Sequence, residues 1–205
     1  YGTDPMGVTA ENIAEMTGIT RLEQDEFALA SHQRAVAAQD SGKFGEEILP
    51  VSVPQRKGDP VVVSQDERPR RDTSLEALSR LKPAFKPNGT VTAGNSSGLN
   101  DGAAAMLVMS AEKAHALGLK PMARFISSAA SGIEPRIMGL GPIEATRRAL
   151  ARAGLQIGDI SLAEINEAFA VQTLAVMREL GLPHTITNVN GGAVALGHPL
   201  GCSGA

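Results

Sequence analysis

The chain has 205 residues and a formal net charge of −3, a balance that argues against a general nucleic-acid binder with a basic face. Hydrophobic residues make up 42% of the sequence but aromatic residues only 3%, so aliphatic side chains must form the core, and the 22 glycines favour close packing of helices on a sheet, as in α/β proteins. The one cysteine excludes an internal disulfide, which fits a reducing compartment, and the longest apolar run, residues 103–109, is too short to cross a membrane.

Capping signals predict two helices near the N-terminus. Thr9 can cap a short helix that ends near Gly18. Thr20 and Glu23 have the T-x-x-E spacing of a capping box, in which each residue satisfies a backbone N–H at the helix start. We therefore expect a longer helix to begin there and to stop near Gly42.

A region of short elements follows these helices. Residues 48–53 and 60–64 are rich in valine and predict two short strands. Thr73 and Glu76 repeat the capping-box spacing before a short helix, and Pro83 limits its length.

The sequence changes character near residue 90, where apolar strands begin to alternate with amphipathic helices. The expected strands span residues 104–109, 122–130, 162–166 and 184–190, and the expected helices span 111–117, Pro142 to Gly154, and 167–180. This alternation predicts βαβ units on an internal sheet.

Two segments carry the candidate chemistry. Residues 188–205 are rich in glycine and hold a lone histidine, His198, in a turn where other groups can approach closely. Upstream, Asn166 lies where an expected strand turns into a helix, and an amide and an imidazole at two such turns can jointly receive an oxyanion. The glycines match neither G-x-G-x-x-G nor a P-loop, so a nucleotide-phosphate loop is not expected.

The sequences of these two segments, NEAFA at 166–170 and GGAVALGHPLGCSGA at 191–205, resemble the thiolases, which make or cleave 3-ketoacyl-CoA thioesters. Further segments match the family in the same order: MGVTAEN (6–12), DEFA (25–28), KPAF (82–85), TAGNSSG (92–98), NDGAA (100–104) and MGLGP (138–142). Together, in this order, they identify the chain as a member of that family.

The resemblance implies an α/β protein with the thiolase fold, in which two similar halves stack into αβαβα layers and a loop domain is inserted. Residues 1–98 would form part of the loop domain, 99–118 the last strand and helix of the N-terminal half, and 119–205 the first part of the C-terminal half. The fold would then be incomplete in this chain. Thiolases use two catalytic cysteines, and we expect both to lie outside it, since Cys202 falls at a variable small position of the family.

The resemblance assigns catalytic roles to His198 and Asn166. His198 would activate the nucleophilic cysteine and donate to the thioester oxygen, while Asn166 would hold a water that completes the oxyanion hole. The alternatives are a structural histidine in a turn and an asparagine that ends a strand or caps a helix. Glu167 is expected to have a supporting role.

The expected coenzyme A site is spread over the chain. Ser97 matches the serine that contacts the pantetheine arm, Arg70 a basic residue near the nucleotide end, and Met6 a methionine on the acyl side; a cation suits the CoA phosphates. The residues expected to line the pantetheine tunnel are Ala84, Phe85, Ala168 and Phe169. The alternatives are a solvated loop for Arg70 and ordinary core positions for Phe85 and Phe169.

The implied function is CoA-dependent acyl transfer by a ping-pong route through an acyl-cysteine. The enzyme would cleave 3-ketoacyl-CoA to acetyl-CoA and a shortened acyl-CoA, or run the reverse Claisen condensation of acetyl-CoA. Coenzyme A and acyl-CoA would be substrates, with no permanently bound cofactor and no metal. Pro5, before the M-G that opens the first motif, favours the degradative 3-ketoacyl-CoA thiolases of fatty-acid β-oxidation over the biosynthetic enzymes.

We also expect a homodimer or homotetramer in the cytoplasm, the bacterial cytosol or an organelle matrix, with neither nucleic acid nor membrane as a partner. Two alternatives stay open: a non-catalytic thiolase-like protein that binds acyl-CoA or lipid, and a piece of a thiolase that is inactive alone. In the second case, exposed sheet edges and an exposed apolar face predict aggregation.

Overall fold

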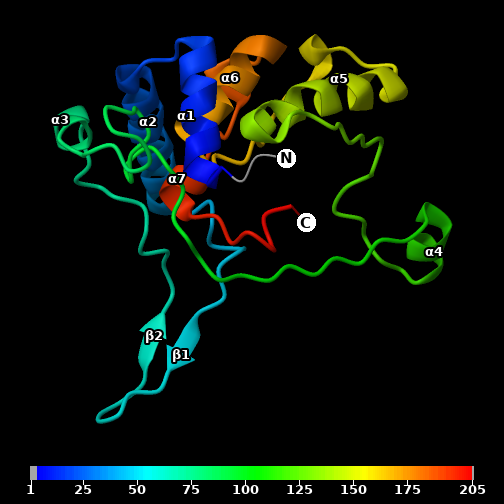
Figure 1. Cartoon of the computed structure of the whole chain (residues 1–205). Helices are drawn as coiled ribbons and strands as arrows, with labels where there is room; N and C mark the ends of the chain where they lie inside the picture. Colours follow the sequence, from blue (N-terminus) through cyan, green and yellow to red (C-terminus); the bar gives the residue numbers. More distant parts are fainter. Residues whose placement is uncertain (1–3, 205) are drawn as a thin grey trace.

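The computed structural model describes residues 4–204 as a group of helices joined by long extended connections (Figure 1). The helices are α1 (Met6–Thr17), α2 (Arg21–Asp40), α3 (Leu75–Ser79), α4 (Ala111–Ala116), α5 (Gly141–Ala153), α6 (Ala170–Leu180) and α7 (Ala193–Leu196). Three short 3-10 helices accompany them: η1 (Pro135–Leu140), η2 (Ile157–Asp159) and η3 (His184–Ile186). The strands are β1 (Val51–Val53) and β2 (Val61–Val63).

The first two helices form where the sequence predicts them. Helix α1 begins at Met6, so Thr9 lies inside it and does not cap it; its hydroxyl donates to the Met6 carbonyl at 2.7 Å. The helix ends at Thr17 and is capped by Gly18, near the predicted stop; the φ of Gly18, 69°, is the left-handed conformation that glycine adopts readily. Helix α2 ends at Asp40, close to the predicted stop at Gly42.

The predicted capping box at the start of α2 is confirmed. The Thr20 hydroxyl accepts from the Glu23 N–H at 3.3 Å, and the Glu23 carboxylate accepts from the Thr20 N–H at 2.6 Å. This backbone bond, with help from the Thr20 hydroxyl and the Arg178 guanidinium, lowers the pKa of Glu23 to about 2. The capping box therefore fixes the residue at which α2 begins.

Replacing Thr20 with alanine should lower the free energy of unfolding by about 1 kcal/mol, because the Glu23 N–H at the helix start loses its partner. Urea unfolding followed by circular dichroism measures the change. Thr20→Ser keeps the hydroxyl and serves as the control. Equal losses in the two variants would show that the methyl group, not the cap, carries the stability.

A small antiparallel hairpin projects from the helices (Figure 1). It pairs Val51 with Val63, Ser52 with Val62 and Val53 with Val61. All six residues are exposed. The valine-rich runs at 48–53 and 60–64 predict these strands correctly, although each strand is shorter than its run.

Helix ends in the rest of the chain also follow local signals. Helix α3 is capped by Ser74, whose hydroxyl accepts from the Ala77 N–H at 3.1 Å, so the predicted cap at Thr73 is wrong by one residue. Gly118 and Gly154 follow α4 and α5 with φ of 66° and 69°, as predicted.

The internal sheet predicted for the second half does not form among residues 4–204. Residues 104–109 and 122–130 run as extended chain outside any sheet, and side chains such as Leu107 and Val108 are 88% and 85% exposed. One parallel bridge, Ala163 to Thr187, joins the runs expected to be strands at 162–166 and 184–190, and η3 replaces the start of the second. A strand needs the backbone of a neighbour, and the described residues supply none at these places.

Helix α6 begins at Ala170, three residues later than predicted. Phe169 is instead extended, with φ −143° and ψ 143°. The Ala168 carbonyl accepts from the Ser97 N–H at 3.0 Å, and Ser96 and Phe169 form an antiparallel bridge. Tertiary pairing therefore replaces the first helical turn.

The core lies between α1 and α6, with α2, η1 and α5 packed around them. It is aliphatic, as the composition predicts, with Ile13, Val91 and Val171 fully buried. Large apolar side chains at 106–109 and 125–126 lie exposed. Among residues 4–204, no helix has both the length and the apolar character to cross a bilayer.

Candidate active site

One extended segment, residues 95–99, holds the two candidate catalytic loops side by side. The Asn95 carbonyl accepts from the N–H of Ala170, the first residue of α6, at 2.9 Å. Farther along the segment, the Gly98 carbonyl accepts from the His198 N–H at 3.1 Å, and Leu99 and His198 form a parallel bridge. The segment therefore joins the loop that carries Asn166 to the loop that carries His198.

Asn166 and His198 meet in the structure. The amide nitrogen of Asn166 lies 3.2 Å from Nε2 of His198. An amide N–H₂ group only donates, so this hydrogen bond requires an unprotonated Nε2 and places the imidazole proton on Nδ1. Nδ1 lies 2.8 Å from the Ser203 hydroxyl, which itself donates to the Pro199 carbonyl at 3.2 Å. The Nε2 lone pair therefore accepts from the Asn166 amide, and the Ser203 hydroxyl anchors the ring on its other side.

A cavity of about 640 Å³ opens beside this pair. It is lined by five of the residues predicted for the site: Met6, Asn166, Ala168, Phe169 and His198. Much of the remaining wall is aliphatic and comes from α1, η1 and α6, including Ile13, Met138 and Val176. The arrangement places a proton acceptor and a hydrogen-bond donor at the wall of an apolar cavity.

The other predicted residues lie around this cavity or away from it. The ring of Phe85 packs edge-on against Phe169, with centroids 6.0 Å apart, and Ala84 and Phe85 line a second, smaller cavity. Ser97 adjoins the site through its backbone bond to Ala168. Arg70 lies on an exposed loop and does not line either cavity.

A glycine of α1 permits the position of Phe85. A Cβ atom at Gly7 would lie 2.3 Å from carbons of the Phe85 ring, so the ring rests directly on the helix backbone. This close approach brings the predicted tunnel residue against α1, next to Met6.

Glu167 is buried and supports the site without lining the cavity. Its exposed fraction is 1%, and its carboxylate accepts from the Ser31 hydroxyl at 2.7 Å, the Asn188 amide at 2.8 Å and the Val194 N–H at 3.0 Å. Burial raises the pKa of Glu167, while these hydrogen bonds lower it. Glu167 follows Asn166 directly in the sequence. Its carboxylate therefore ties this part of the site to α2 through Ser31, to the loop before α7 through Asn188, and to α7 through Val194.

Three further residues of the site are not identified from the sequence. Ser203 anchors His198, and its place in the glycine-rich motif, five residues after the histidine, is the signal that could have identified it. Gln172 on α6 donates to the Asn166 carbonyl and accepts from the Phe169 N–H, both at 3.3 Å. Glu164 lines the cavity, and burial and the nearby Glu167 raise its pKa.

The loop that carries Arg70 is fastened to α2 by a buried histidine. Nδ1 of His32 accepts from the Arg70 N–H at 3.1 Å. Burial, followed by the charges of Arg70 and Arg68, lowers the pKa of His32 below 6.5. The folded state therefore favours the neutral ring, which the hydrogen bond requires.

We expect this histidine to make the protein less stable in acid. The unfolded state binds a proton near pH 6.5 and the folded state only at lower pH, so the stabilising contribution is present above pH 6.5 and is lost as the pH falls through the folded pKa. Denaturant unfolding at a series of pH values should show this slope, and His32→Gln should reduce it. Part of the slope should persist, because burial and the charge of Arg34 also lower the pKa of His184. An unchanged slope in His32→Gln would contradict the assignment.

No group of three or more His, Cys, Asp or Glu side chains is placed to hold a metal ion in the part of the chain that the structure describes. The site offers an imidazole base and an amide donor, fixed beside an apolar cavity. Such a site suits the activation of a nucleophile and the stabilisation of an oxyanion.

The chain matches two protein-family models over most of its length. Residues 1–112 match the family model described as "Thiolase, N-terminal domain", and residues 119–205 match "Thiolase, C-terminal domain". The chain therefore belongs to the thiolase family. The membership predicted from the motifs is confirmed.

Individual relatives are similar over nearly the whole chain. An acetyl-CoA acetyltransferase of Pseudomonas aeruginosa is 60% identical over 199 residues, which cover 97% of this chain and 51% of that protein. A probable acetyl-CoA acyltransferase of Staphylococcus epidermidis is 58% identical over 200 residues, covering 98% of this chain and 51% of that protein. The chain spans about half the length of the curated relatives it matches.

Solved structures show the same fold. The crystal structure of the Bacillus anthracis acetyl-CoA acetyltransferase matches with a TM-score of 0.93 at 51% identity, over 98% of this chain and 51% of that one. Human mitochondrial 3-ketoacyl-CoA thiolase matches with a TM-score of 0.89 at 45% identity, over 98% of this chain and 50% of that one. The chain thus has part of the α/β thiolase fold, as predicted, even though the strands expected at 104–109 and 122–130 are unpaired among residues 4–204.

Proposed function

We propose that the protein containing this chain is a CoA-dependent acyltransferase. It cleaves 3-ketoacyl-CoA with coenzyme A to acetyl-CoA and a shortened acyl-CoA, or condenses acetyl-CoA in the reverse direction. The observation that carries the proposal is the 3.2 Å contact between the Asn166 amide and Nε2 of His198 at the wall of the apolar cavity. The names of the similar relatives support the same chemistry.

His198 has the geometry of a base in the first half of such a reaction. Once it releases the Asn166 amide, its unprotonated Nε2 takes the proton of a cysteine thiol, which we assign to a part of the protein outside this chain, and Nδ1 stays bound to Ser203. The thiolate attacks the keto carbonyl, the bond between the second and third acyl carbons breaks, and the acetyl-CoA carbanion takes a proton from a second acid. An acyl-cysteine remains.

In the second half, the thiol of coenzyme A gives its proton to the second acid, which lost its own in the first half, and the coenzyme A sulfur attacks the acyl-cysteine. The shortened acyl-CoA leaves and the cysteine thiolate is restored. Negative charge develops on a thioester oxygen in both halves of the reaction: that of the acetyl-CoA carbanion in the first and that of the acyl-cysteine in the second. The protonated Nε2 of His198 and a water held by Asn166 can donate to that oxygen, because both groups are fixed before the substrate arrives.

We place the coenzyme along the line of residues that adjoin the cavity. Ser97, Ala84 and Phe85 would contact the pantetheine arm with Ala168 and Phe169, and the Phe85–Phe169 ring contact supports this grouping. Arg70 would attract the phosphates at the exposed end, and Met6 would contact the acyl group, whose cavity it lines. The site needs no metal and no permanently bound cofactor.

The remaining parts of the proposal concern the whole protein. Residues 1–98 would belong to the loop domain, 99–118 to the N-terminal half and 119–205 to the C-terminal half. We propose a homodimer or homotetramer in the cytoplasm that acts in fatty-acid β-oxidation, with no nucleic-acid or membrane partner. The aliphatic cavity wall supports substrates with acyl chains longer than acetoacetyl.

Thiolysis by the purified whole protein tests this function. Acetoacetyl-CoA and longer 3-ketoacyl-CoA substrates are supplied with coenzyme A, and the loss of the ketoacyl thioester is followed. We expect turnover of both, with the longer substrates preferred. Binding of acyl-CoA without turnover would replace the proposal with the non-catalytic thiolase-like alternative.

A further inference from the structure

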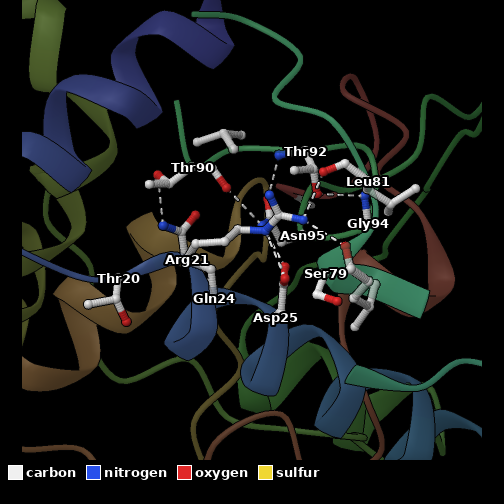
Figure 2. Close-up of polar contacts among 12 residues, drawn as sticks. Thr20, Arg21, Gln24, Asp25, Ser79, Leu81, Thr90, Thr92, Gly94 and Asn95 are labelled. Carbon is white, nitrogen blue, oxygen red and sulfur yellow. Dashed lines mark hydrogen bonds and ion pairs between the residues drawn. The ribbon is translucent and has the colours of Figure 1, made fainter. Parts of the chain in front are cut away.

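Asn95 is buried at the start of the segment that joins the two catalytic loops. Its exposed fraction is 0%, and both ends of its amide are engaged. Nδ2 donates to Asp25 Oδ1 at 2.9 Å and to the Thr90 carbonyl at 3.1 Å, while Oδ1 accepts from the Thr92 N–H at 2.8 Å (Figure 2). The side chain therefore closes the 90–95 loop on itself and ties it to α2.

The carboxylate that receives Asn95 is itself fixed. Asp25 is 2% exposed, and its other oxygen pairs with Nε of Arg21 at 2.7 Å. Nη2 of Arg21 donates to the carbonyls of Leu78 and Leu81 at 2.6 and 3.0 Å. Figure 2 shows these groups converging between α2 and the neighbouring loops. Asp25 is thus a rigid anchor, because neither oxygen can move without breaking a contact.

The backbone of Asn95 connects this anchored side chain to the site. Its carbonyl accepts from the Ala170 N–H, and two residues later the Ser97 N–H donates to the Ala168 carbonyl. Asn166 lies two residues before Ala168, and His198 is bonded to Gly98 on the same segment. A displacement of the Asn95 backbone would therefore move the hydrogen-bonding groups that hold the Asn166 loop and the His198 loop at the same time.

We propose that Asp25 and Asn95 are a positioning pair that sets the register of segment 95–99 and thereby the distance between Asn166 and His198. Neither side chain lines the cavity, so the pair acts through the backbone and not on the substrate. The inference rests on the proposed function, since it assigns the pair a role in the same site. Placement errors near 1 Å can lower a rate by about 100-fold, which makes such a pair consequential.

The test uses the whole protein with Asn95→Asp, which keeps the shape of the side chain but sets one carboxylate against another and against the Thr90 carbonyl. We expect kcat for thiolysis to fall about 100-fold, with a much smaller change in KM. Hydrogen exchange should accelerate at the Ala170, Ser97 and His198 amides, which depend on segment 95–99 for their partners.

Gln24→Met is the matched control for lost stability. Gln24 lies beside Asp25 on α2, is also 0% exposed and donates to the Thr90 hydroxyl at 2.9 Å, but it has no bond to segment 95–99. We expect a reduced melting temperature with kcat within about 2-fold of the parent, the change anticipated when the catalytic geometry is kept. If Asn95→Asp also lowers the melting temperature while kcat and the three amides stay unchanged, the pair is only structural and the inference fails.

The reciprocal variant Asp25→Asn with Asn95→Asp keeps the inference testable if the single variant does not fold. An amide at 25 can donate to a carboxylate at 95 and accept from Arg21, so kcat should recover part of the loss. No recovery in a folded double variant would count against the pair. If the parent shows no thiolysis, the proposed function fails; faster exchange at the three amides in Asn95→Asp would still uphold the positioning role, and unchanged exchange would refute it.

Discussion

Replacing His198 with alanine should lower kcat for thiolysis by the whole protein by at least about 100-fold. The variant loses the unprotonated Nε2 that accepts the thiol proton and the donor that the protonated ring offers to the thioester oxygen. It also leaves the Asn166 amide without its 3.2 Å partner. Steady-state thiolysis with acetoacetyl-CoA and a longer 3-ketoacyl-CoA measures the effect.

Two other variants show whether that loss belongs to the site. His115→Ala removes an exposed histidine from α4 and should leave kcat unchanged. Ser203→Ala keeps the imidazole but removes the 2.8 Å partner of Nδ1, so it should give an intermediate loss. Full activity in His198→Ala would rule out this histidine as the base and return it to the structural role considered from the sequence.

Replacing Gly191 with alanine should give the largest loss of stability, about 3 kcal/mol in the free energy of unfolding. Two effects add. Gly191 has φ of 83°, where an L side chain is strained, and a Cβ there would lie 2.7 Å from the Ala35 Cβ and 2.7 Å from the Ser31 carbonyl oxygen. The second contact is with the backbone of α2, which cannot move aside cheaply.

Gly154→Ala separates the two effects. Gly154 has a similar conformation, with φ of 69°, but nothing lies within 4 Å of the position of a new Cβ. We expect it to lower the free energy of unfolding by only about 1 kcal/mol, the strain alone. Denaturant unfolding of both variants gives the comparison. Equal losses would mean that α2 shifts freely and that the contact before α7 is not tightly packed.

Local signals in the sequence predict the helices well. The Thr20–Glu23 capping box and the terminal glycines Gly18 and Gly154 act within one turn of chain, so their effect does not depend on the rest of the fold. The strands expected in the second half fail for the opposite reason, whereas β1 and β2 form as predicted. Residues 104–109 have the right side chains for a buried strand, but a strand forms only when another backbone lies beside it.

The residues of the site likewise divide into those that the sequence identifies and those that only the tertiary structure reveals. His198 and Asn166 stand out because their motifs are unusual, and the structure brings them together. Asp25 and Asn95 lie in matching motifs too, but no pattern in the sequence says that residues 70 positions apart share a buried hydrogen bond. The late start of α6 has the same origin, because the pairing of 168–169 with segment 95–99 is a tertiary contact.

Segment 95–99 belongs to the part of the chain that matches the N-terminal thiolase domain, while the loops it supports belong to the part that matches the C-terminal domain. The site is therefore assembled across a domain boundary. A chimaera of two thiolases joined between residues 112 and 119 would take the supporting backbone from one parent and the side chains of Asn166 and His198 from the other. Its activity would then report how interchangeable that backbone is, so this junction limits how freely the halves of related enzymes can be recombined.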